Sequence, residues 1–243
     1  MTQQPSPSDD TRALIRHHAD RFRHELESTK TVPTIDRLIE RSPVTIYKTA
    51  LTATIEKALT ASDLTARTIR LIRAKVRALG RTLAGLFLPQ NDRTGREGVI
   101  VIDGERRDQL LRWTVSHELG HAILKHSGTA YFDGSWRSLD GLAREASTDI
   151  AIQEVEANLF ASYLVFPDGA WHSLVTQDRF NETTLRRVAR GFDVSHMSAA
   201  MELVQRAHRP SAAIVIQRGM PEFLGSTSKE LHASGVHTSQ KLR

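Results

Sequence analysis

Two histidines stand four residues apart inside a segment with a helical pattern. The segment covers about residues 107–126 and contains His117-Glu118-Leu119-Gly120-His121. Residues four apart lie one turn apart on the same face of an α-helix, so the two imidazoles can converge on one ion. Glu118 is rotated by about 100° from His117, so its carboxylate can reach the same region without being a ligand. The pattern His-Glu-x-x-His on a helix therefore predicts a metal site.

A catalytic zinc site normally has three protein ligands and one open position, so a third ligand is required. A second helical pattern covers residues 148–165, with Glu154 and Asn158 four apart on one face. Glu154 can supply a carboxylate ligand, and Asn158 can hydrogen-bond to a ligand histidine from behind. Glu156 is the alternative third ligand; otherwise it is a solvated surface residue. The chain has no cysteine, which excludes thiolate ligands and favours catalytic over structural zinc.

The other histidines are expected to have structural or surface positions without metal binding. His126 lies five residues beyond His121, off the ligand face, and we expect a polar residue at a helix end. His17, His18 and His24 fall in the first helical pattern without carboxylates at ligand spacing, so we expect them to be exposed. The alternative to a metal site is a buried pair of hydrogen-bonded histidines.

The predicted site has the parts of a hydrolase. Bound zinc lowers the pKa of its water to about 7, and a neighbouring carboxylate can take the proton. Glu118 is the predicted general base. A further donor should stabilise the oxyanion, and Tyr131, Tyr163, His172 and nearby arginines remain open as candidates.

Local patterns divide the chain into five parts. Residues 1–10 are rich in Pro, Ser and Asp and are predicted to be disordered. The expected parts that follow are a helical region over 11–82, a metal-bearing core over 83–170, a helical segment over 171–210, and a short strand with a flexible tail over 211–243. Helices are expected over 11–27, 34–41, 44–60, 63–80, 182–190 and 195–208, strands over 83–89, 98–103 and 212–217, and a surface loop over 129–145.

The net charge of +5 can attract nucleic acid or acidic partners. The predicted helix over 63–80 has five basic residues, which we interpret as a solvated face; weak nucleic-acid contact is the alternative. No run of eighteen apolar residues exists, so no membrane span is expected. The first ten residues contain neither a basic start nor an apolar stretch, which predicts a cytoplasmic protein without a secretory signal.

These motifs together resemble the ImmA/IrrE family of metallopeptidases, a gluzincin group. The matching segments are Trp113 to His121, Glu154 to Ala161, and Tyr163 to Pro167. Phe166 stands where the family commonly has Met. Arg190 to Ser195 also resembles the step between two helices in that family, so the resemblance covers about residues 83–205.

The resemblance implies a mainly helical α+β fold. Its centre would be a minimal zincin-like core, with a short sheet packed on two metal-bearing helices and a helix-turn-helix-like pair after it. It also implies that His117, His121 and Glu154 bind Zn²⁺, that Glu118 is catalytic and that Asn158 supports a ligand. Members of the family typically cleave a helix-turn-helix repressor and so release stress or mobile-element genes. The alternatives are a DNA-binding regulator with structural zinc and an antirepressor that binds its partner without cutting it. Residues 11–82 resemble nothing that we can name.

Overall fold

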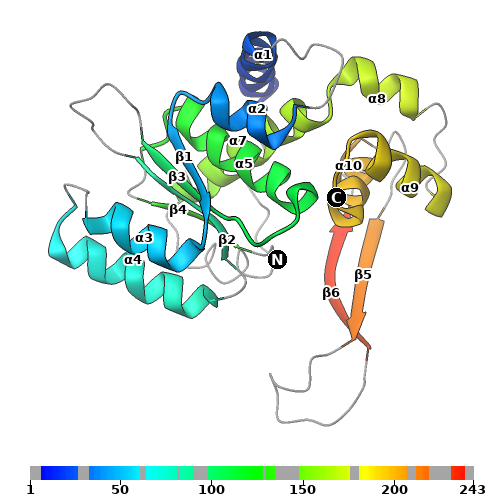
Figure 1. Cartoon of the computed structure of the whole chain (residues 1–243). Helices are drawn as coiled ribbons and strands as arrows, with labels where there is room; N and C mark the ends of the chain where they lie inside the picture. The colour runs from blue at the N-terminus through cyan, green and yellow to red at the C-terminus, as the bar shows by residue number, and fades with distance from the viewer. Residues whose placement is uncertain are drawn as a thin grey trace. The chain divides into compact units, whose positions relative to one another are not determined.

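The computed structural model describes ten stretches of the chain. Figure 1 colours these stretches and draws the other residues as a thin grey trace. The described stretches are residues 7–26, 33–60, 64–80, 83–89, 98–127, 130–134, 148–175, 181–206, 212–218 and 231–238. The fold is α+β and mainly helical, as predicted. The chain divides into two compact units, Met1–His172 and Ser173–Arg243, and each is described by itself.

The first unit combines helices with a four-stranded sheet. Its elements are α1 (Asp9–Glu25), α2 (Ile35–Glu40), β1 (Thr45–Thr49), α3 (Leu51–Thr60), α4 (Ala66–Leu79), β2 (Leu83–Leu88), β3 (Val99–Asp103), α5 (Asp108–Ile123), β4 (Tyr131–Gly134), α7 (Thr148–Val165) and the start of α8 (Asp168–Leu174). The strand order is β1-β3-β2-β4. β1 runs parallel to β3, while β2 is antiparallel to both of its neighbours.

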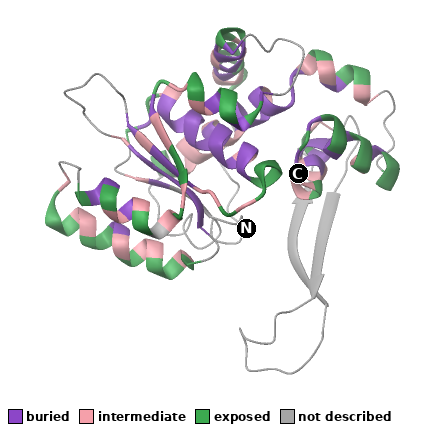
Figure 2. Ribbon diagram, in the orientation of Figure 1, coloured by how far each residue is buried: buried purple, intermediate pink, exposed green. Residues whose placement is uncertain are grey.

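Helices cover both faces of this sheet. Phe87 and Ile100 belong to the core that includes α1, α2, α5 and α7, whereas Leu86 and Val101 belong to the core formed with α3 and α4. Because successive side chains of a strand point to opposite faces, each central strand feeds both cores. β2 is accordingly buried at every position, and Figure 2 shows the middle of the sheet as buried. A continuous apolar strand is what two covered faces require.

Two predictions about the strands of this unit were wrong. Residues 45–49, predicted as the start of a helix over 44–60, form β1, and the helix α3 begins only at Leu51. Thr45, Ile46 and Tyr47 are of types that suit a strand, and pairing with β3 decides the outcome. Likewise, 131–134 is the edge strand β4 rather than loop, because it pairs with β2. The rest of the expected loop, apart from residue 130, lies outside the described residues.

The N-terminal prediction of disorder over residues 1–10 is wrong at its end. Residues 1–6 lie outside the described part of the chain. Ser8 accepts a hydrogen bond from the backbone N–H of Thr11 and so caps α1, whose first turn contains Asp9 and Asp10. A serine cap followed by acidic residues is a helix-start signal, which outweighs the local composition.

The second unit contains the end of α8, then α9 (Glu182–Gly191), α10 (His196–Gln205), β5 (Ala212–Arg218) and β6 (Leu231–Thr238). Asn181 and Ser195 cap the two helices, and Asp193 turns the chain between them with a φ of 49°. The predicted helix pair and the strand over 212–217 are confirmed. The expected loose tail is wrong over β6, which pairs antiparallel with β5 despite its polar sequence. Among the described residues, no helix is long and apolar enough to span a bilayer.

Candidate metal centre

The centre forms where α5 and α7 cross at very short distance. A Cβ atom placed on Gly120 would lie 3.0 Å from the Cα of Ala157 and 3.1 Å from its carbonyl oxygen. Only glycine on one helix and a small residue on the other permit this backbone contact. α5 is buried continuously from Thr114 to Ala122, although the stretch contains five polar side chains. Such burial of polar groups demands partners for them.

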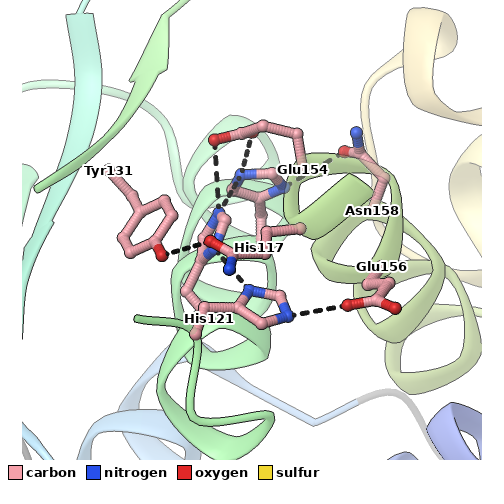
Figure 3. Close-up of polar contacts among 8 residues, drawn as sticks. His117, His121, Tyr131, Glu154, Glu156 and Asn158 are labelled. Carbon is pink, nitrogen blue, oxygen red and sulfur yellow. Dashed lines mark hydrogen bonds and ion pairs between the residues drawn. The ribbon is translucent and has the colours of Figure 1, made fainter. Parts of the chain in front are cut away.

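Three of the predicted ligands meet at one point. The Nε2 atoms of His117 and His121 are 3.1 Å apart, and the Glu154 carboxylate lies 3.3 Å from the first and 3.6 Å from the second. One ligand atom from each residue falls within 4.8 Å of the other two. Figure 3 shows Glu154, from α7, directed toward the two histidines of α5.

The donor set fits a divalent metal ion. Glu154 Oε2 is buried and, among the described residues, takes part in no hydrogen bond, which is costly unless a cation compensates it. Two imidazoles and one carboxylate are the ligands of many catalytic zinc sites.

The protonation of His117 is fixed by Asn158. His117 Nδ1 lies 3.1 Å from Asn158 Oδ1. An amide oxygen only accepts, so Nδ1 carries the proton and donates. Nε2 then presents a lone pair toward Glu154 and His121, as a metal ligand must. This is the supporting contact predicted from the four-residue spacing of Glu154 and Asn158.

Burial keeps the second histidine neutral. The pKa of His121 is well below its ordinary value, first because burial disfavours the cation and then because His117 and His126 lie close by. Burial also lowers the pKa of His126, to about 4. Neutral imidazole is the form that binds a metal.

Glu118 lies against the sheet. It is fully buried, and its Oε1 would be 3.5 Å from a Cβ atom on Gly85 of β2. That Cβ atom would also come within 2.6 Å of Thr114 Cγ2. The absence of a side chain at Gly85 therefore lets α5 rest on β2 with the Glu118 carboxylate between them.

Sequence reasoning missed the part played by His126. It is 8% exposed, and its Nδ1 lies 2.8 Å from Nδ1 of His121. Lys125 has a φ of 56°, and the N–H of His126 donates to the carbonyl of His121 at 3.0 Å. This left-handed turn folds His126 back beneath the helix. The signal was hard to see because Lys, rather than Gly, takes the left-handed conformation.

Glu156, the alternative third ligand, contacts His126 instead, with Oε2 at 3.1 Å from Nε2. Residues two apart on a helix are separated by about 200°, so Glu154 and Glu156 face different parts of α5. Burial raises the pKa of Glu156. The structure thus gives the two carboxylates different partners.

Among the candidates for an oxyanion donor, Tyr131 lies beside the ligands. Its ring stacks on His121 with centroids 3.8 Å apart, and its hydroxyl donates to Gln153 Oε1 at 2.6 Å. Tyr163 instead lies 4.8 Å beneath the guanidinium of Arg16, and His172 belongs to α8.

The family profile described as IrrE N-terminal-like domain, a peptidase family, matches residues 82–204. This is about half of the chain, and it contains His117, Glu118, His121, Glu154 and Asn158. The chain belongs to the ImmA/IrrE family of metallopeptidases. A curated relative, the radiation response metalloprotease IrrE of Deinococcus deserti, is 32% identical over 155 residues. That alignment takes in 60% of this chain and 52% of the relative, so the chain spans about half the length of the relative that it matches.

Membership of the ImmA/IrrE family agrees with the geometry of the site. The profile starts just before β2 and ends within α10, so it includes both helices of the candidate metal centre and the helix pair. α1 to α4 and β1 lie outside it. The part of the chain that precedes the profile supplies one strand of the sheet and the helices on its second face.

Proposed function

We propose that this ImmA/IrrE chain is a zinc-dependent endopeptidase that cleaves a specific helix-turn-helix transcriptional repressor. One observation carries the proposal: two buried imidazoles and a partly buried carboxylate from two helices converge within 4.8 Å. Zinc is the metal that such nitrogen and oxygen ligands favour for hydrolysis. Bound there, it would polarise the scissile carbonyl and supply a water with a pKa of about 7.

The side chains of the protein have separable parts in this proposal. Glu118, next in sequence to His117, accepts the proton of the attacking water on its carboxylate and later donates it to the leaving amine. His117, His121 and Glu154 hold the metal, and Asn158 fixes the ring of His117. Burial of Glu118 excludes bulk water from the step.

The substrate part of the proposal is supported by the family alone. A repressor substrate would relieve repression of stress or mobile-element genes and would require the enzyme to act in the cytoplasm. The curated relative is named for a radiation response, which is compatible with a regulated role of this kind. The exposed Arg187 and Arg190 of α9 leave room for weak nucleic-acid contact, although arginine faces are often simply solvated.

The test uses the purified full chain and the helix-turn-helix repressor encoded nearest to its gene. We expect zinc-loaded wild-type protein to cut this repressor at one position and Glu118→Gln to bind zinc normally while losing at least about 10²-fold in rate. Fragments are detected by intact-mass spectrometry. Cleavage by Glu118→Gln at the wild-type rate would contradict the assigned base. Binding of the repressor without cutting would favour an antirepressor.

A further inference from the structure

Two further side chains, His126 and Glu156, continue a series of hydrogen bonds from His121 on the side away from Glu154. His121 Nδ1 is 2.8 Å from His126 Nδ1, and His126 Nε2 is 3.1 Å from Glu156 Oε2. All three residues are at least partly shielded: His121 is fully buried, His126 is 8% exposed, and the Glu156 side chain is 22% exposed. His126 follows α5 and Glu156 belongs to α7, so this series of hydrogen bonds links α5 and α7 a second time.

The order of donors along this series follows from its ends. A carboxylate accepts hydrogen bonds, so His126 Nε2 must carry the proton that faces Glu156. With its one ring proton placed there, His126 presents the Nδ1 lone pair to His121. His121 Nδ1 must then be the donor, which leaves the Nε2 lone pair directed toward His117 Nε2 and Glu154. The reverse order would put a proton on His121 Nε2, and that atom could not bind a metal.

We propose that His126 and Glu156 are positioning residues that hold His121 in its metal-binding tautomer and orientation. Their role matches that of Asn158 behind His117. Two side chains in series are needed here, because a ring nitrogen of His126, unlike an amide oxygen, can be either a donor or an acceptor. Glu156 decides which nitrogen of His126 carries the proton. The inference concerns the site named in the proposed function and rests on that site binding zinc. Both act through the ring of His121, and neither belongs to the group of three ligands.

The first test is zinc affinity, measured by competition with a chromophoric chelator at neutral pH on the full chain. His126→Phe keeps a ring but removes the acceptor, and Glu156→Ala removes the carboxylate; each should weaken zinc binding by about 10–100-fold. Glu156→Gln should remain within about 3-fold of wild type, because its amide oxygen can accept the same hydrogen bond. His24→Phe changes an exposed histidine of α1 and is the matched control, with unchanged affinity expected.

The second test reads the tautomers directly and needs no substitution that disturbs folding. In zinc-loaded protein with ¹⁵N-labelled histidine, long-range ¹H–¹⁵N correlations distinguish a proton on Nδ1 from one on Nε2. We expect His126 with its proton on Nε2 and His121 with its proton on Nδ1. Glu156→Ala should broaden or shift the His126 signals, whereas those of the exposed His24 should stay in place.

Three results separate this inference from the proposed function. A proton on His126 Nδ1, or zinc affinity unchanged in both His126→Phe and Glu156→Ala, overturns the positioning role alone. Zinc binding with the expected tautomers but without repressor cleavage overturns the proposed function alone. A wild-type chain that binds no zinc contradicts both.

Discussion

The helices α5 and α4 cover opposite faces of the same sheet and are buried in different ways. α5 is buried without a break from Thr114 to Ala122, polar residues included, whereas in α4, which the structure describes throughout, Ile72 alone is buried. The outward side of α4 is exposed at Arg67, Arg70 and Leu71. Figure 2 shows the same contrast between the two helices.

The difference separates a helix that carries chemistry from one that only covers a core. α4 needs an apolar stripe, and its other side is solvated. α5 must be enclosed on several sides, because its polar side chains have to be held dry and aligned, and this enclosure depends on small residues such as Gly85 and Gly120. Changes on α4 should therefore alter stability without altering metal binding, while changes around α5 should alter both or metal binding alone.

The largest effect on stability is expected from Ile72→Ala on α4. Ile72 is 4% exposed within the core of β2, β3, α3 and α4. Its truncation leaves a cavity and should lower the free energy of unfolding by about 2–5 kcal/mol, measured by urea denaturation. Zinc affinity of the folded protein should not change. Leu71→Ala, at a neighbouring position that is 63% exposed, is the control with little effect on either quantity.

Next in size is Gly120→Ala at the crossing of α5 and α7. The new methyl group would be 3.0 Å from Ala157 Cα, so the helices must separate. We expect a loss of about 1–3 kcal/mol in unfolding free energy, together with weaker zinc binding, because Glu154 moves with α7. Gly169→Ala is the matched control: a Cβ atom there meets nothing within 4 Å, and calorimetry should show unchanged or slightly higher stability. Equal zinc affinity in Gly120→Ala and wild type would break the link between close packing and the metal centre.

A smaller and more selective effect is expected from Asn158→Ala. Loss of the acceptor at Nδ1 frees the ring of His117, and zinc affinity should fall about 10–100-fold. The melting temperature of the zinc-free protein should change little, since Asn158 is only half-buried. An equal loss of stability with retained affinity would make Asn158 a packing residue.

The smallest effect is expected from Arg67→Ala on the exposed side of α4. Its unfolding free energy should stay within about 0.5 kcal/mol of wild type, with zinc affinity unchanged in the chelator competition. A change in zinc affinity would show that α4 influences the metal centre on the other face of the sheet. That result would contradict the separation between α4 and α5.

The sequence predicted α5, α7, β2, β3 and the grouping of His117, His121 and Glu154, because each rests on local periodicity or spacing. It did not predict β1 and β4, since short polar strands are defined by their pairing with β3 and β2. His126 was misjudged for a related reason: straight helical geometry places it off the ligand face, and only the left-handed turn at Lys125 returns it to His121. The spacing of residues in the sequence does not show which strands pair or which side chains meet through tertiary contacts.

The central claim is that Glu154, and not Glu156, completes a zinc site with His117 and His121. Metal content of the full chain, measured by plasma mass spectrometry after equilibrium dialysis against a constant, saturating concentration of free zinc and corrected for the zinc in the buffer, tests it most directly. We expect about one zinc per wild-type chain and per Glu156→Ala chain, as for a single three-ligand site, and almost none in Glu154→Ala. Full zinc content in Glu154→Ala, or loss of zinc in Glu156→Ala under the same saturating conditions, would contradict it.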